Sequence, residues 1–445
     1  MGCFLCADLV GRRVPVTLPK PSQAGLLLSL ALAAGMWNYV DGILIPFQKA
    51  QATEHGTPRG NLSDLYPRWL GARELLLHGR DPYSPEVTRE IQTGYYGRPL
   101  DPARPGDPRD EQAFAYPAYV ALLLAAVIRL PFPAVQAGFR WLLVVLTILS
   151  VLHWMRALGC RFSRAAVMIF VILTLGSFPA LQGIRLQQLS VLVAALIAAS
   201  IAALSAGGLV LSGVLLALAS IKPQLVLPLA LWLLLWACAD WRRRQRWAWG
   251  FAATMLLLGL GAQVILPGWI GKFYAAVASY RRYAGGHSLL DVLVSPTGGM
   301  ALSAFLLLLL AMRCWGLRNQ PARTPGFALA TCLVLAVTLA VIPMFAPYNQ
   351  LLLLPGVMLL VQSSRGLWQR GAVMRGILCL SAGLVFWPWL ATASLAGALW
   401  FFPLATVQRA WQLPLYTSLL IPLAVLAPLL LLEQAPPDGN PIAEG

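Results

Sequence analysis

The stretch that decides the fold is residues 25–47, GLLLSLALAAGMWNYVDGILIPF, which is long and apolar enough to cross a lipid bilayer. A long polar segment, residues 48–112, follows it and holds ten of the seventeen acidic residues of the chain. Almost everything after that segment is apolar. If the protein acts on a polar substrate, this first polar segment is where its chemistry is expected.

The overall composition is that of a polytopic membrane protein. The chain is 58% hydrophobic and only 11% charged, with a mean hydropathy of +0.70, whereas soluble domains carry about 25% charged residues. We therefore expect an all-α integral membrane protein, a single bundle of about twelve transmembrane helices. The predicted spans are residues 25–47, 135–155, 163–181, 188–204, 207–221, 224–240, 248–267, 298–313, 325–345, 349–364, 376–398 and 413–432.

The net charge of +16 does not indicate a nucleic-acid partner, because the basic residues fall in short clusters between apolar stretches. Such clusters are typical of cytoplasmic loops, so the partner they indicate is the bilayer of the plasma (inner) membrane. The clusters are Arg12, Arg13 and Lys20; Arg156, Arg161 and Arg164; Arg242, Arg243, Arg244 and Arg246; Arg313, Arg318 and Arg323; and Arg365, Arg370 and Arg375. With these clusters inside, both termini are cytoplasmic and the polar segment 48–112 is extracytoplasmic.

One apolar stretch, residues 114–130, does not fit as a span. If it crossed the membrane, every later loop would change sides and the arginine clusters would face outward. We therefore expect a helix that lies in, or dips into, the outer membrane interface. It should end at Arg129 and the Pro131-Phe132-Pro133 break.

Five polar segments collect on the outer side in this topology. They are residues 48–112, 182–188, 221–224, 269–297 and 347–350. Polar residues beside apolar helices are costly in a membrane unless they face a cavity or a partner. The sequence therefore predicts one outward-facing polar site at the membrane surface.

The order of several short motifs resembles glycosyltransferase family 87, a branch of the GT-C superfamily of transferases that use polyprenyl-phosphate sugars. The motifs are Asn61-Leu62-Ser63-Asp64-Leu65-Tyr66, Gly71-Ala72-Arg73-Glu74-Leu75-Leu76, Gly79-Arg80-Asp81-Pro82-Tyr83, Phe114-Ala115-Tyr116-Pro117-Ala118, Gln187-Gln188 and Lys222-Pro223. In this chain Leu65 stands where the family has an aromatic residue, and Ala118 where it has a second proline. The resemblance covers about residues 25–365.

The resemblance implies a GT-C-type bundle with a large first extracytoplasmic loop that contains juxtamembrane helices. Residues 1–22 would be a cytoplasmic tail and residues 23–365 a GT-C-like catalytic module, with residues 48–134 as its extracytoplasmic loop. Residues 366–445 would be carboxy-terminal spans and a cytoplasmic tail. The family members it is similar to include polyprenyl-phosphate-mannose-dependent mannosyltransferases.

Asp64 is the candidate catalytic residue. By its position alone it could cap a helix over residues 65–78, since Asp is a favoured N-cap. The resemblance implies instead that it is the general base, because the family places its base at the matching Asp. Sugar transfer from a lipid phosphate needs such a base for the acceptor hydroxyl and a cation for the departing phosphate.

The candidates for binding the donor phosphate or the substrate come from the other polar segments. They are Tyr116, Arg185, Gln188, Lys222, Arg281, Arg282, His287, Tyr348 and Asn349. Plainer alternatives stay open for several of them. Lys222 and Arg185 could be snorkelling side chains, the segment with Arg281 and His287 could lie on anionic lipid, and Tyr348-Asn349 could be a structural turn.

No cofactor is certain from the sequence. Neither a Walker loop nor a dinucleotide-binding fingerprint is present, so the sugar donor should arrive already linked to a lipid. The seven cysteines show no metal or disulfide spacing. A divalent metal stays undecided, because a basic residue could replace a cation at the phosphate.

The expected function is an inverting membrane glycosyltransferase. It would move mannose or a similar sugar from a polyprenyl-phosphate donor to a lipid or cell-envelope glycan acceptor on the extracytoplasmic (periplasmic) side, with Asp64 as the base. The alternative is a transporter or lipid flippase, but such proteins usually carry internal repeats, and none is evident. A polymerase or ligase of diphosphate-linked glycans would be expected to have its large polar loop later in the chain.

Overall fold

The computed structural model describes residues 23–54 and 63–432, except 102, 105, 109, 285 and 344 and the side chains of 282–284. Within these residues the protein is all-helical and has no strand. The two tails expected to be cytoplasmic, residues 1–22 and 433–445, lie outside the described part of the chain. So do Asn61 and Leu62 of the first motif.

The first elements are a continuous helical rod, Gln23–Glu54, and the helices of the loop that follows it. The rod is made of α1 (Gln23–Asn38), the π-helix η1 (Tyr39–Leu44) and α2 (Ile45–Glu54). The loop carries α3 (Tyr66–His78), α4 (Pro85–Tyr96) and α5 (Val120–Leu124). The next helices are α6 (Phe132–Ala157), α7 (Arg164–Leu175), α8 (Phe178–Arg185), α9 (Leu189–Ser205), α10 (Leu209–Ala219), α11 (Pro223–Ala239) and α12 (Trp241–Ile265). The last are α13 (Trp269–Ala284), α14 (Leu289–Leu293), α15 (Pro296–Leu317), α16 (Pro325–Val341), η2 (Pro347–Leu353), α17 (Leu354–Trp368), α18 (Ala372–Ala398), α19 (Leu404–Gln408), η3 (Leu413–Leu415) and α20 (Ile421–Leu432).

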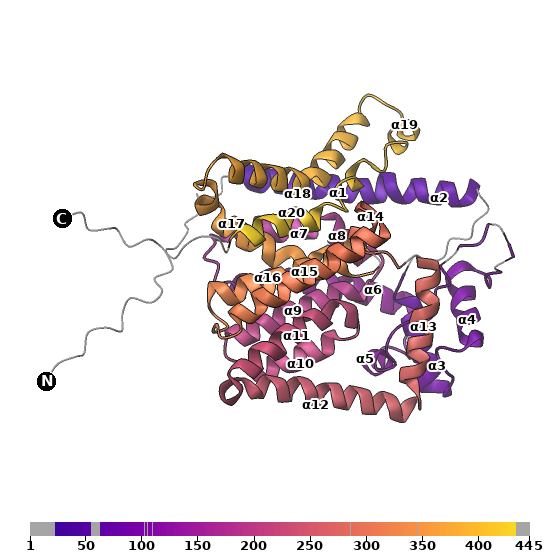
Figure 1. Ribbon diagram of the computed structural model, residues 1–445. Helices are drawn as coiled ribbons and strands as arrows, with labels where there is room; N and C mark the ends of the chain where they lie inside the picture. Colours follow the sequence, from indigo (N-terminus) through magenta and orange to yellow (C-terminus); the bar gives the residue numbers. More distant parts are fainter. Residues whose placement is uncertain are drawn as a thin grey trace, which may run out of the picture.

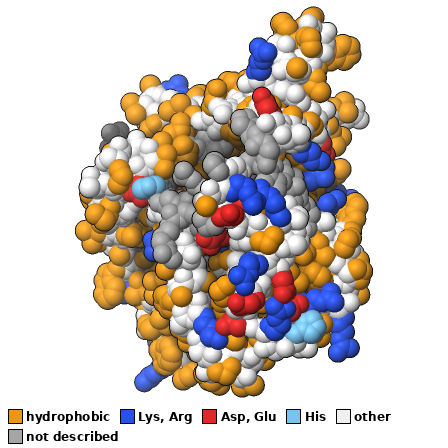
Figure 2. Space-filling view, turned by 90° about the vertical axis from the view of Figure 1, so that its right-hand side faces the viewer, with side chains coloured by type: hydrophobic (Ala, Val, Ile, Leu, Met, Phe, Trp, Pro, Cys, Tyr) orange, Lys and Arg blue, Asp and Glu red, His pale blue; other side chains and the backbone are white. Residues whose placement is uncertain are grey.

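The long apolar helices form one bundle, and the loop helices gather at one end of it. In Figure 1 that end is on the right, where α3, α4, α5 and α13 lie together. Figure 2 views this end, where Lys, Arg, Asp and Glu side chains gather among hydrophobic ones. On the helices of this end, Arg80, just after α3, pairs with Glu90 of α4, and Lys272 of α13 pairs with Asp81. The charged helices of the first polar segment thus gather at one end of the bundle (Figure 1).

The helix lengths are compatible with a multi-pass membrane protein. Six helices are long and apolar enough to cross a membrane, or seven if α7 and α8, bent by 55°, form one span. Five further apolar helices are shorter. Each of the twelve predicted spans overlaps one of these helices or helix pairs. That all twelve cross the bilayer stays a prediction.

The expected interfacial helix over residues 114–130 is largely absent. Only α5 is helical there, and turns follow it. Tyr119 and Val120 are buried, and the Tyr119 hydroxyl donates a hydrogen bond of 2.7 Å to the Ser220 carbonyl oxygen. The apolar residues of this stretch thus fill the space between α3 and the bundle, and this packing replaces the regular helix expected from hydropathy.

Helix α3 is the element that positions the loop against the bundle. It ends at Gly79, which has a left-handed backbone (φ 66°), and it buries Trp69, Ala72 and Leu75. At Gly71 the helix approaches the ring of Phe114 so closely that an added Cβ would lie 2.4 Å from Cδ2. Because Gly71 has no side chain, α3 can pack this closely against the Phe114 ring.

We predict that Gly71→Ala destabilises the protein by about 1–3 kcal/mol, because the fully buried Phe114 ring would have to shift. Thermal unfolding in detergent measures the effect. The matched control is Gly138→Ala in α6, where an added Cβ meets nothing within 4 Å. Equal melting temperatures for the two variants would contradict the proposed close approach.

Candidate functional site

A cavity of about 610 Å³ opens among the helices at the polar end of the bundle. All five polar segments of the sequence contribute side chains to its lining. Representative lining residues, one from each segment, are Asp64, Gln188, Lys222, Arg281 and Asn349. Segments far apart in the sequence thus converge on one space, as the polar patterning predicts.

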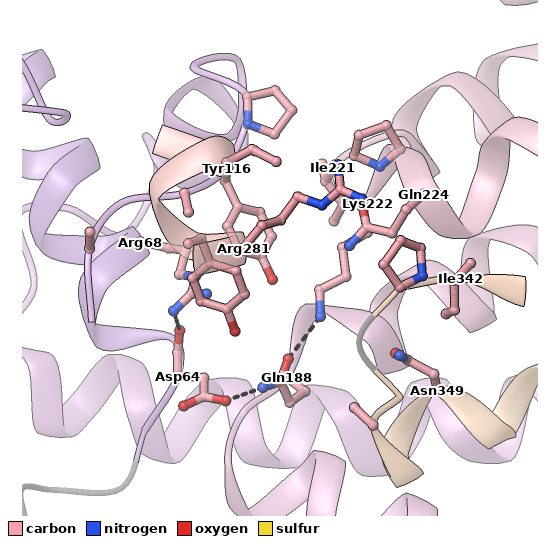
Figure 3. Close-up of a pocket in the computed structure, with 18 of the residues that line it drawn as sticks. Asp64, Arg68, Tyr116, Gln188, Ile221, Lys222, Gln224, Arg281, Ile342 and Asn349 are labelled. Atoms are coloured by element: carbon pink, nitrogen blue, oxygen red, sulfur yellow. Dashed lines mark hydrogen bonds between the residues drawn. The ribbon is translucent and has the colours of Figure 1, made fainter. Parts of the chain in front are cut away.

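Asp64 lines the cavity, and its carboxylate faces Gln188 (Figure 3). Its backbone N–H donates a 2.9 Å hydrogen bond to the Leu186 carbonyl, which ties the start of α3 to the bundle. The N-cap of α3 is Leu65, and that helix start has no side-chain cap. The Asp64 carboxylate instead accepts a hydrogen bond from Nε2 of Gln188. The geometry therefore excludes the N-cap role for the Asp64 side chain.

Lys222 sits opposite Asp64 and is only 7% exposed. It occupies the N-cap position of α11, just before Pro223. Its ammonium donates hydrogen bonds to Oε1 of Gln188 at 2.9 Å and to Oγ of Ser190 at 2.7 Å. The two ends of the Gln188 amide thus join a carboxylate and a cation, as Figure 3 shows.

The turn before α9 holds Gln188 in this orientation. Gln187 has a left-handed backbone (φ 47°) and is fully buried. Its Nε2 donates to the carbonyl oxygens of Ile184 at 2.7 Å and Arg185 at 2.8 Å, and its Oε1 accepts from Gln136 at 3.0 Å. Because these bonds satisfy the Gln187 amide, the unusual backbone geometry of the turn is supported.

Aromatic and polar groups complete the surroundings of the Lys222 ammonium. The rings of Tyr348 and Tyr116 have their centroids 5.1 and 5.8 Å from Nζ, within the range of a cation–π attraction. Ser190 accepts a hydrogen bond from Lys222, and its hydroxyl in turn donates one of 2.7 Å to Oδ1 of Asn349. A buried ammonium with this many partners is stable inside an apolar bundle.

The electrostatics of the cavity suit a carboxylate that takes up a proton. Burial raises the pKa of Asp64 above its usual value, and the charge of Asp110 adds to this rise. The nearby charges of Arg68 and Lys222 oppose it by favouring the ionised carboxylate. Burial also raises the pKa of Tyr280 to about 12, so its hydroxyl is neutral and can donate a hydrogen bond.

The structure brings most of the predicted site residues to the cavity. Tyr116, Gln188, Lys222, Arg281, Tyr348 and Asn349 line it together with Asp64. Arg185 does not line it and pairs with Asp41, its guanidinium lying 5.2 Å from the Trp37 ring centroid. His287 is exposed and is not a lining residue either. The Arg282 side chain lies outside the described part of the chain. Binding roles for these three stay predictions.

The sequence analysis does not identify several lining or supporting residues, and Arg68, Ser190 and Asp110 are three of them. Arg68 follows Asp64 by four residues, a spacing that places both near one helix face and could have indicated it. Ser190 follows Gln188 by two residues and bonds Lys222. Asp110 reaches the cavity only through the tertiary fold, and no local pattern marks it.

Among the described residues, no group of three or more His, Cys, Asp or Glu side chains is placed to hold a metal ion.

One comparison with known proteins gives a match. A family model described as glycosyltransferase family 87 matches residues 114–343, which is just over half of the 445-residue chain. No curated protein and no solved structure matches the chain. The matched range includes Tyr116, Gln188, Lys222 and Arg281, whereas Asp64 precedes it.

We predict that the Asp64 carboxyl titrates above its usual pKa of 3.8 and that Lys222→Met moves its midpoint further up, because the variant removes a cation that lowers the pKa. Infrared titration of the protonated carboxyl band measures both midpoints. For the parent protein and for Lys222→Met alike, the Asp64 band is the difference between that protein and the same protein carrying Asp64→Asn. Lys222→Arg keeps the charge and serves as the control. A downward shift in Lys222→Met would contradict this electrostatic account.

Proposed function

The chain belongs to glycosyltransferase family 87, and from this premise we propose the donor, acceptor and mechanism of a membrane glycosyltransferase. The protein transfers mannose or a similar sugar from a polyprenyl-phosphate donor to a hydroxyl of a lipid or cell-envelope glycan. Residues 23–365 form the catalytic module. The resemblance read from the motifs is confirmed at the level of the family, and the sugar and the lipid donor are the further content of this proposal.

The observation that carries the proposal is the hydrogen-bonded series Asp64–Gln188–Lys222 inside one cavity. Glycosyl transfer from a lipid phosphate needs a base for the acceptor and a positive charge for the leaving group. This series supplies one of each. The Gln188 amide keeps the two charges apart, so that neither is neutralised by a direct ion pair.

The chemistry follows from these positions. Asp64 takes the proton of the acceptor hydroxyl while that oxygen attacks the anomeric carbon of the donor sugar. The bond from the anomeric carbon to the phosphate oxygen breaks, and its electron pair stays on the polyprenyl phosphate. Lys222, with Arg281 of α13, balances the negative charge that develops there. A single displacement of this kind inverts the anomeric configuration.

The rest of the cavity lining suits a lipid-linked sugar. Apolar residues of the α11 start and of the segment after α16 form part of the wall, and among them are Ile221, Pro223, Ile342 and Pro343. Such a wall suits a prenyl chain. Tyr280 and Asn349 supply polar groups on the same cavity for sugar hydroxyls.

The transporter or flippase alternative is not favoured, because the family match is to glycosyltransferases.

We place the cavity on the extracytoplasmic side and both termini in the cytoplasm, because the arginine clusters between the spans mark the cytoplasmic loops. A cysteine at Glu86 in α4 should then react with a membrane-impermeant maleimide in intact cells, and a cysteine at Arg243 should react only after permeabilisation. Both positions are exposed. The background is a variant without the seven native cysteines. Labelling of position 243 in intact cells would contradict the orientation.

The central test is transfer of radiolabelled sugar from a panel of purified polyprenyl-phosphate donors. Asp64→Asn should lower the transfer rate by about 100- to 10,000-fold, because an amide cannot accept the proton. In the parent protein, kcat/KM should fall as the pH drops through the raised pKa of Asp64, since protonation removes the base. Glu86→Gln, which changes an exposed carboxylate of α4, is the matched control. Full activity of Asp64→Asn would remove Asp64 from the mechanism.

A further inference from the structure

Arg68 enters the cavity from α3, one helical turn beyond Asp64. Its Nη1 donates a 2.7 Å hydrogen bond to the backbone carbonyl oxygen of Asp64. The guanidinium carbon lies 4.4 Å from the centroid of the Tyr116 ring. Tyr116 is itself held in place, because its carbonyl oxygen accepts a 2.5 Å hydrogen bond from the Tyr83 hydroxyl. The guanidinium is therefore held by the hydrogen bond from Nη1 and by the contact of one of its faces with the Tyr116 ring.

These contacts leave one edge of the guanidinium without a hydrogen bond among the described residues. The Nε atom of Arg68 is buried and has no hydrogen-bond partner among the described residues. The Nε and Nη2 donors lie on the edge adjacent to the bonded Nη1, and together they form a planar fork that matches two oxygens of a phosphate. A buried donor without a partner is costly, and two ligand oxygens bound at this edge would remove that cost.

Lys222 is less suited to this bidentate contact. Two of its three ammonium donors already bond Gln188 and Ser190. It therefore has one donor left and acts on a ligand mainly as a point charge. Arg68 has the free fork, and the charges of Arg68 and Lys222 both act on Asp64. The two cations thus flank the carboxylate with different donor geometries.

We propose that the Nε–Nη2 edge of Arg68, which has no hydrogen bond among the described residues, binds two phosphate oxygens of the lipid-linked donor, and that Arg68 is a phosphate-binding residue of the reaction. The inference rests on the proposed function for the identity of the ligand, and it adds the residue and the mode of recognition. Phosphate oxygens could also be carried by the acceptor. The shared chemistry is a phosphate ester, and the test separates the two sources.

The test measures binding of a short-chain prenyl phosphate to the purified full-length protein in nanodiscs, without any sugar transfer. Arg68→Lys keeps the positive charge but loses the planar fork, so it should weaken binding by about tenfold or more. Arg68→Met should weaken it at least as much. The matched control is Arg73→Lys on the same helix, whose guanidinium lies 5.4 Å from the Trp69 ring centroid outside the cavity lining. Its affinity should equal that of the parent protein.

Two further arms identify the source of the phosphate. The matching prenyl alcohol should bind equally weakly to the parent protein and to Arg68→Lys, because it has no phosphate oxygens. In transfer assays Arg68→Lys should raise the KM for the donor and leave the KM for the acceptor unchanged. A raised acceptor KM with an unchanged donor KM would overturn the assignment to the donor.

The outcomes also separate this inference from the proposed function. Arg68-dependent binding of prenyl phosphate with no transfer from any donor would support the phosphate site and reject the reaction. Transfer that depends on Asp64, together with unchanged prenyl phosphate binding in Arg68→Lys and Arg68→Met, would support the reaction and overturn the role of Arg68. Melting temperatures of both variants should match that of Arg73→Lys, which checks that the binding change is not caused by unfolding.

Discussion

The buried ammonium of Lys222 is the constraint on which the rest of the site depends. A cation inside an apolar bundle must be paired or hydrogen-bonded, because its desolvation is too costly otherwise. The partners found here are the oxygens of Gln188 and Ser190. With Oε1 of Gln188 bound to Lys222, its Nε2 must point the other way, and it meets the Asp64 carboxylate there. The need to satisfy one charge thus orients the amide that positions the other.

This arrangement requires that the loop after the first span be seated accurately on the bundle. Helix α3 is held by its buried face and by the close approach of Gly71 to Phe114. The backbone bond from Asp64 to Leu186 then joins the start of α3 to the turn that carries Gln188. Asp64 is therefore positioned by packing and backbone bonding, and its carboxylate is not used to cap the helix.

Much of the fold and part of the site follow from the sequence. Hydropathy locates a helix or helix pair at every expected span, and the costs of polar groups in a membrane predict that five polar segments share one cavity. Asp64, Gln188 and Lys222 stand out because they are polar residues beside long apolar helices. The family resemblance adds the function that the family match confirms in its coarse form.

Other features depend on tertiary contacts that a single sequence does not show. Hydropathy predicts a regular helix over residues 114–130, but packing under α3 leaves only the five residues of α5 helical. Arg185 shares the polar turn with Gln188, yet it pairs with Asp41 of η1, a contact that only the folded chain brings together. Asp110 is one of many acidic residues in a long loop, and only the folded chain distinguishes it from the others.

The most direct measurement is a cryo-electron microscopy structure of the protein with a non-transferable prenyl-phosphonate sugar. We expect the phosphonate to lie between Arg68 and Lys222, with the anomeric carbon facing the Asp64 carboxylate and the prenyl chain along the apolar wall. A phosphonate bound away from Lys222, or a sugar whose anomeric carbon faces Asp110 and not Asp64, would contradict this expectation.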